Sequence, residues 1–147
     1  MAASKWQMYH SAKKYIANGT INWTASTLRI KILAAAKAAA VSNYARSTFA
    51  SLTHIATNLV VPILSVTGNA VTLSASSALK FDSTAMVFSI SGGAVSCLYA
   101  VVGVSGGKAI GWCKLTSSGV VTISAGNTLT ITPAAAGYFV LTGGTTA

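Results

Sequence analysis

The side chains that most often carry catalysis are scarce in this sequence. Its 147 residues contain two histidines, His10 and His54, and one acidic residue, Asp82. Catalysis by paired carboxylates needs two acids, and no G-x-S-x-G turn is present to expose a nucleophilic serine. We therefore predict that the chain is not an enzyme, although an active site shared between subunits would leave no trace in one sequence.

The two cysteines, Cys97 and Cys113, complete the set of residues that could bind a metal. A structural zinc site needs four ligands in paired spacing, and the cysteines and histidines of this chain are scattered singly. The sequence therefore predicts no metal site and no cofactor.

The cysteines are also predicted to remain unpaired with each other. If Gly106-Gly107 forms a two-residue hairpin turn, Cys113 faces Ala100 and Cys97 faces Thr116. Side chains alternate between the two faces of a strand, so the two sulfur atoms would point to opposite faces. We expect two free, buried thiols.

Positive charge is the chain's most unusual chemical property. Ten lysines and arginines against one acid give a net charge of +9, and seven of the ten lie in the first 46 residues. Charged residues make up only 7% of the chain, against about 25% in typical globular domains. A polar, uncharged surface could accompany this composition, but the 52% hydrophobic content favours a surface largely covered by partner chains.

Nucleic-acid binding is an alternative use of the positive charge. The isoelectric point is about 10.0, and several aromatic residues lie among the basic ones and could stack on bases or pack the N-terminal helix onto a sheet. These aromatic residues are Trp6, Tyr9, Tyr15, Trp23 and Tyr44. A basic surface equally suits an acidic protein partner, so nucleic acid is the less favoured ligand.

No membrane association is expected. The apolar segment Ile32–Val41 contains Lys37 and is shorter than the roughly 20 residues that a span requires. The N-terminal residues lack the apolar region of a signal peptide.

A helix is predicted over about residues 5–17, near the start of the chain. Ser4 and Gln7 fit a capping box, and apolar residues follow at helical spacing. Asn18-Gly19 provides a stop.

A strand follows from about residue 27, in which Leu28, Ile30 and Ile32 alternate with Arg29 and Lys31. The alternation predicts one buried face and one basic face. The next segment, residues 34–46, is interpreted as a loop or short helix.

The rest of the chain to residue 142 reads as short strands separated by turns of glycine, serine and asparagine every 8–13 residues. Pro62 within residues 58–66 suggests an edge strand or a bend, and the nearly continuous apolar run 95–104 predicts a strand covered on both faces. We predict a single, mainly β domain over residues 1–147. Its fold class is an antiparallel β-sandwich or barrel of about seven or eight strands with a short N-terminal helix. The further expected strands cover residues 58–66, 70–76, 85–90, 95–104, 108–115, 120–124, 128–132 and 137–142.

Three stretches of the sequence resemble a family of small virion proteins of tailed bacteriophages. "KKYIANGTINWTASTLRIKILA" (residues 13–34) is similar to the family's opening helix, Gly-Thr-Ile turn and alternating strand. "SCLYAVVGVSGGKAIGWCKL" (96–115) and "SSGVVTISAGNTLTITPAAAGYFVLT" (117–142) are similar to its later glycine hairpin and Gly-Asn-Thr-Leu-Thr-Ile strand. The acids usual after the Gly-Thr-Ile turn are replaced by Asn22, Thr24 and Ser26, and a stretch rich in tyrosine and glycine is missing around residues 67–70.

The resemblance implies a structural protein of the virion, most plausibly one that decorates or cements the capsid. The implied partners are the major capsid protein and further copies of the chain, with a trimer favoured. The chain would then lie in the capsid after assembly in the cytoplasm of a bacterial host. Tail, neck and fibre roles remain alternatives. The residues expected to face an acidic capsid surface are Lys13, Lys14, Arg29, Lys31 and Arg46.

Overall fold

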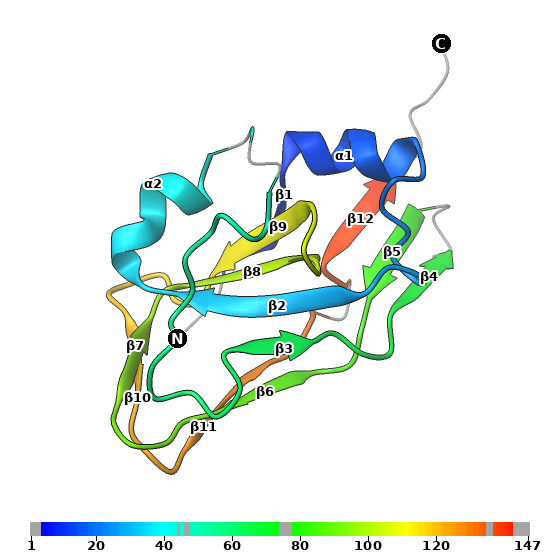
Figure 1. Cartoon of the computed structure of the whole chain (residues 1–147). Helices are drawn as coiled ribbons and strands as arrows, with labels where there is room; N and C mark the ends of the chain where they lie inside the picture. Colours follow the sequence, from blue (N-terminus) through cyan, green and yellow to red (C-terminus); the bar gives the residue numbers. More distant parts are fainter. Residues whose placement is uncertain (1–3, 44, 46–47, 74–77, 135–136, 143–147) are drawn as a thin grey trace.

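The computed structural model of the chain is built mainly from antiparallel strands (Figure 1). It describes residues 4–43, 45, 48–73, 78–134 and 137–142. These residues form twelve strands, two α-helices and one 3-10 helix. The predicted mainly β, antiparallel fold class is confirmed, although the strands are shorter and more numerous than expected.

The largest sheet has five strands in the order β1-β9-β8-β2-β3, with every neighbouring pair antiparallel. The strands are β1 (Gln7–Met8), β9 (Ala109–Lys114), β8 (Tyr99–Val104), β2 (Leu28–Leu33) and β3 (Ile63–Ser65). β8 lies centrally and is buried on both faces, as its continuous apolar sequence predicts. β3 lies at an edge directly after Pro62, which also agrees with the sequence.

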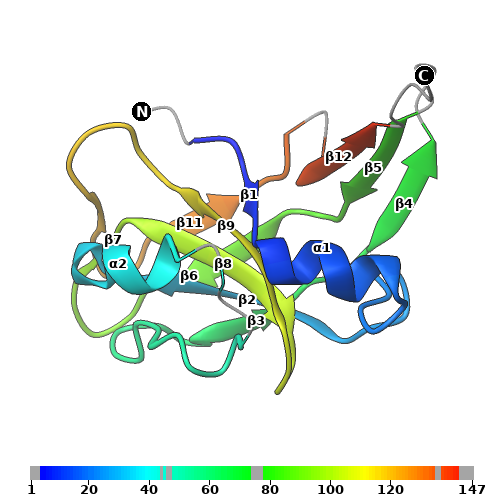
Figure 2. The same cartoon turned by 90° about the horizontal axis from the view of Figure 1, so that it is seen from above.

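The remaining strands form three smaller antiparallel sheets. β7 (Val95–Cys97) pairs with β10 (Val121–Ile123), and β6 (Met86–Ser89) pairs with β11 (Thr128–Ile131). The third sheet has the order β12-β5-β4 and contains β4 (Ala70–Leu73), β5 (Ala78–Asp82) and β12 (Phe139–Thr142). Figures 1 and 2 show the β7–β10 pair and this three-stranded sheet at opposite ends of the molecule.

The N-terminal helix is shorter than predicted, because α1 covers only His10–Ala17. Ser4 does not cap it: the Ser4 N–H donates to the Lys114 carbonyl at 2.8 Å, and the Ser4 hydroxyl oxygen accepts the Lys114 N–H at 2.8 Å. The open edge of β9 supplies backbone partners, so the residues before α1 extend along it as β1. The predicted stop is confirmed, since Gly19 follows the helix with φ +77°.

Two further differences concern the strands. The apolar run 95–104 is divided at Leu98, whose N–H donates to the Leu33 carbonyl at 2.9 Å and whose carbonyl accepts the Leu115 N–H at 2.7 Å. β5 was not predicted, because its five residues contain Lys80 and Asp82 among the apolar ones. The expected strand 70–76 is described only as far as Leu73, since residues 74–77 lie outside the described part of the chain.

The segment predicted as a loop or short helix is helical over residues 35–41. A 3-10 turn, η1 (Ala35–Lys37), leads directly into the one-turn helix α2 (Ala38–Val41). Val41 is buried, and its carbonyl accepts a 2.7 Å hydrogen bond from the Tyr9 hydroxyl. This bond ties the short helix to the start of α1.

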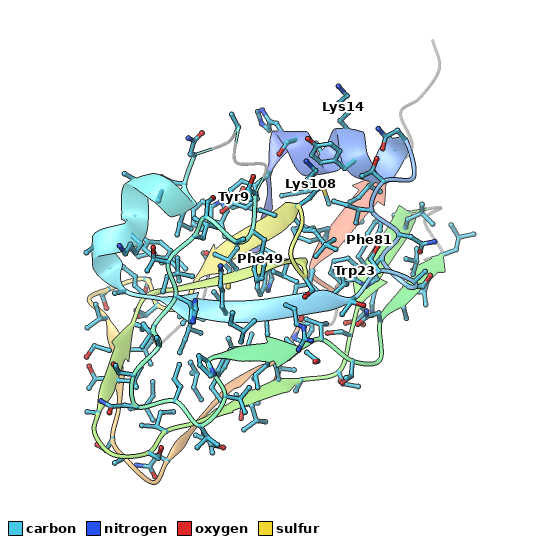
Figure 3. The ribbon with its side chains drawn as sticks, viewed as in Figure 1. Tyr9, Lys14, Trp23, Phe49, Phe81 and Lys108 are labelled. Carbon is cyan, nitrogen blue, oxygen red and sulfur yellow. The ribbon has the colours of Figure 1, made fainter. Side chains whose placement is uncertain are left out.

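An aromatic cluster links the five-stranded sheet to the three-stranded one. Trp23 lies 5.7 Å from the ring of Phe81 and 5.3 Å from that of Tyr138 (centroid distances), and Figure 3 shows Trp23 and Phe81 side by side. The Trp23 indole N–H donates to the Asp82 carbonyl at 2.8 Å. Because aromatic rings bury large areas and prefer such edge contacts, this cluster fixes how the two sheets meet.

Candidate functional site

The basic residues expected to form one docking surface lie in different places. Lys13 and Lys14 are exposed on α1, and Figure 3 shows Lys14 pointing away from the ribbon. Arg29 is half-buried, and its Nη1 donates to the Ser65 hydroxyl at 2.7 Å. Arg46 lies outside the described residues.

Lys31 lies on the expected face of β2, but the expectation that it is available at the surface is wrong, because the residue is only 1% exposed. The basic face of β2 is covered at Lys31 by the chain that follows α2. This covering segment, residues 48–55, is anchored by the Phe49 N–H to the Gly107 carbonyl (2.9 Å) and by the Ile55 N–H to the Ile32 carbonyl (3.0 Å). Phe49, Leu52 and Ile55 recur every third residue, a signal that could have indicated a packed segment.

Gly103 on β8 lies against the Phe49 ring of the covering segment. A Cβ atom there would lie 2.5 Å from the nearest ring carbon of Phe49, so only glycine leaves room for that ring. Phe49 in turn meets Lys31: the lysine Nζ donates to the Phe49 carbonyl at 2.6 Å and lies 4.1 Å from the ring centroid. The ammonium group therefore has a carbonyl and a π face as partners.

Lys31 and Arg29 both line a pocket of about 330 Å³. The third ionisable residue of its lining is His54, and the other lining residues are Phe49, Ala50, Ile63, Ser105 and Gly106. Burial lowers the pKa of Lys31 from 10.5 to about 8. Burial, and secondarily the charge of Lys31, lower the pKa of His54. We call this the basic pocket; it contains no acidic residue.

A larger groove of about 990 Å³ lies on another part of the surface and shares no lining residue with the basic pocket. Its walls come from the N-terminal segment, α1, β9, β10, β11 and β12. The lining is largely apolar and includes Trp6, Met8, Leu129, Ile131 and Phe139. Lys5, His10 and Lys13 supply its basic side chains, and we call it the apolar groove.

Two of the strands that line the apolar groove, β1 and β11, lie at sheet edges. Within the described residues, β1 pairs only with β9 and β11 pairs only with β6. Open edges of this kind can accept a further strand. The groove thus combines apolar surface, positive charge and backbone groups that could bind an extended segment.

The outer end of β4 and β5 exposes large apolar side chains. Leu73 is 71% exposed and Leu79 is 40% exposed, and they are direct partners in the β4–β5 register. Val71 lies two residues from Leu73 on the same face of β4 and is also exposed. Figure 1 shows this end of the sheet projecting beyond the five-stranded sheet. We call Val71, Leu73 and Leu79 the apolar sheet end.

The single acidic side chain is already engaged. The Lys80 Nζ lies 2.9 Å from the Asp82 carboxylate, and both residues are on β5. Since Asp82 is the chain's one acid, no acidic side chain remains to balance the lysines and arginine of the apolar groove and the basic pocket.

The aromatic residues near the basic ones mostly pack inside. Tyr9 and Trp23 are buried, and half-buried Trp6 contacts the Tyr138 ring at 4.8 Å between centroids. Tyr15 lies beneath Lys108, whose Nζ is 4.7 Å from the ring centroid, while Tyr44 lies outside the described residues. Packing therefore accounts for the four described aromatic residues.

Both cysteines are buried and free, as predicted. Cys113 faces Ala100 in the β8–β9 register, also as predicted, whereas Cys97 pairs with Val121 of β10 and not with Thr116. Burial raises the pKa of Cys97 to about 11 and that of Cys113 to about 12. Since the thiolate is the reactive form, both thiols are chemically inert in the folded chain near neutral pH.

Across residues 4–43, 45, 48–73, 78–134 and 137–142, no three side chains of histidine, cysteine or acid come together as metal ligands would. None of the helices in these ranges has the length and apolar composition to cross a membrane. Comparison with protein-family models, with curated proteins and with solved structures gives no match to this chain.

Proposed function

We propose that this chain is a structural protein of a bacteriophage virion, and specifically a capsid decoration protein. It would bind and stabilise the shell of major capsid protein as a homo-oligomer, with a trimer favoured. The resemblance of residues 13–34, 96–115 and 117–142 supports the family. Two features of the surface together carry the proposal. One is the contiguous apolar sheet end, and the other is the positive charge that the chain's own acidic side chain does not neutralise.

The apolar sheet end supports self-association. Single exposed apolar residues are ordinary on protein surfaces, but Leu73 and Leu79 are adjacent across two strands. A second copy that covered them would gain the hydrophobic free energy of the buried area, about 25 cal/mol per Å². The lysines of one copy repel those of another copy. The basic surface therefore suits a different, acidic protein better than it suits a second copy.

The first expected result concerns the oligomer. Sedimentation at micromolar concentration should show an oligomer for the wild-type chain, and the double variant Leu73→Ser, Leu79→Ser should associate at least tenfold more weakly because it loses apolar contact area. Val120→Ser is the matched control, since Val120 is exposed but lies outside β4 and β5. A monomeric wild-type chain would contradict the role given to the apolar sheet end.

The second expected result concerns the particle. We propose that the apolar groove binds an acidic segment of the capsid protein, so binding should weaken when Lys5 and Lys13, which line the groove, are both changed to glutamate. Rebinding of the purified chain to particles that lack it, measured by co-sedimentation, should fall at least tenfold at low salt and less at high salt. Lys37→Glu together with Lys114→Glu is the control with the same net charge.

Counting copies of the chain in purified particles separates the possible locations. A decoration protein should be present in hundreds of copies, whereas tens or fewer would indicate a tail, neck or fibre component.

Equal rebinding of the groove variant and its control would show that the apolar groove is not the contact site.

A further inference from the structure

The buried ammonium group of Lys31 lacks an anionic side chain as its partner. Its described contacts are the Phe49 carbonyl and the Phe49 ring, which are dipolar and quadrupolar groups. A buried charge is costly unless it is paired with an opposite one. The only acidic side chain in the sequence, Asp82, is paired with Lys80. An acidic side chain that balances Lys31 must therefore belong to another molecule.

The basic pocket brings the groups for such an anion together. Arg29 and Lys31 are two residues apart on β2, so their side chains leave the strand on the same face. The hydrogen bond from Arg29 Nη1 to the Ser65 hydroxyl at 2.7 Å holds the guanidinium in place. A guanidinium carries five N–H donors and matches a carboxylate in geometry, so donors remain for a ligand. His54 approaches the same space from the covering segment.

We propose that the basic pocket binds a carboxylate side chain of a partner protein, held by Arg29 and Lys31. The pocket's volume of about 330 Å³ leaves room for a carboxylate side chain. A second copy of this chain is a poor source, because its one acidic side chain is already paired. The partner is therefore a different protein, and its identification as the capsid protein rests on the proposed function.

The protonation of Lys31 and His54 should change when a carboxylate binds in the basic pocket. Arg29, Lys31 and His54 are the charged or titratable residues of its lining. A bound carboxylate stabilises the charged forms of the lysine and the histidine, so its binding raises both pKa values. Affinity should fall as the pH rises past about 8, where Lys31 in the empty pocket loses its proton.

The test is a titration of the full chain with sodium acetate, followed by NMR of the histidine rings. Sodium chloride keeps the ionic strength constant at pH 7, and the signal is read at His54, because His10 lines the apolar groove and would report on that separate site. We expect a saturable shift at His54. The variant Lys31→Met should bind acetate at least tenfold more weakly. Lys37→Met removes the same charge outside the pocket lining and should bind within twofold of the wild type.

Three results would overturn the proposal: no saturable shift at His54 in the wild type, the same affinity in Lys31→Met, or saturable binding of inorganic phosphate without binding of acetate. If Lys31→Met does not fold, Arg29→Gln should lower the acetate affinity in its place, and an unchanged affinity would again be contrary. The titration needs no particle. Acetate binding with failed rebinding to particles would count against the proposed function alone, and successful rebinding without acetate binding would count against the pocket alone.

Discussion

Replacing Trp23 with alanine is expected to lower the free energy of unfolding by about 3–5 kcal/mol, the range for a large aromatic residue removed from a core. Trp23 is 2% exposed and makes edge contacts with Phe81 and Phe139 at centroid distances of 5.7 and 6.2 Å. The substitution also removes the indole donor from the Asp82 carbonyl. Domains of this size are stable by about 5–15 kcal/mol, so a loss of this size is a large share of the total.

Urea unfolding followed by circular dichroism measures this loss, and the thermal midpoint should fall by about 2–4 °C per kcal/mol. Trp112→Ala is the control, because Trp112 is half-buried and contacts the Tyr99 ring at a centroid distance of 5.9 Å. We expect a smaller loss there. If Trp23→Ala does not fold, Trp23→Phe should keep part of the packing and lose the hydrogen bond. An unfolding midpoint unchanged in both Trp23 variants would show that the aromatic cluster does not join the two sheets.

The second large effect is a pH dependence of stability caused by Lys31. Its pKa is about 8 in the folded chain and near its ordinary value of about 10.4 in the unfolded chain. Between these values the unfolded chain binds more protons, so the free energy of unfolding rises with pH. The penalty for the buried charge is complete below pH 8 and is relieved between about pH 8 and 10.5. With about 1.4 kcal/mol for each pKa unit, its full size is on the order of 3 kcal/mol.

Ionisation of the cysteines changes the free energy of unfolding in the opposite direction at higher pH. The pKa values of Cys97 and Cys113 are raised by burial, so above pH 9 the unfolded thiols lose protons first and stability falls. The Lys31 contribution is therefore measured as the difference between Lys31→Met and the wild type. Relative to the wild type, the variant should become less stable by on the order of 2–3 kcal/mol between pH 7 and pH 10. Lys37→Met controls for the loss of one charge, and a parallel pH dependence of Lys31→Met and the wild type would contradict the argument.

Much of the second half of the fold follows from local sequence. Alternating or continuous apolar runs between glycine turns predicted β6, β8, β9, β10 and β11 within a few residues. Gly92, Gly106 and Gly126 adopt positive φ at three of those turns, a conformation that glycine accepts without cost. The periodicity did not show which strands pair, and β2 lies beside β8 although about 65 residues separate them.

The predictions for the start of the chain that proved wrong have one physical cause. Segments far away in the sequence pair with these residues or cover them. The capping pattern of Ser4 and Gln7 favours a helix locally, but the edge of β9 provides stronger tertiary pairing. Similarly, the alternation around Lys31 correctly places Arg29 and Lys31 on one face of β2. It does not reveal that residues 48–55 return to cover that face. The basic pocket could therefore be predicted as a pair of cations on one strand face but not as a pocket.

The Lys80–Asp82 pair contains the single carboxylate side chain of the sequence. Acid unfolding usually follows from protonating many carboxylate side chains, and this sequence contains one. A partner held through several carboxylates would lose its negative charge as the pH falls. Acidification would therefore weaken such a contact by protonating the partner's carboxylates, and this chain would be released in its folded state.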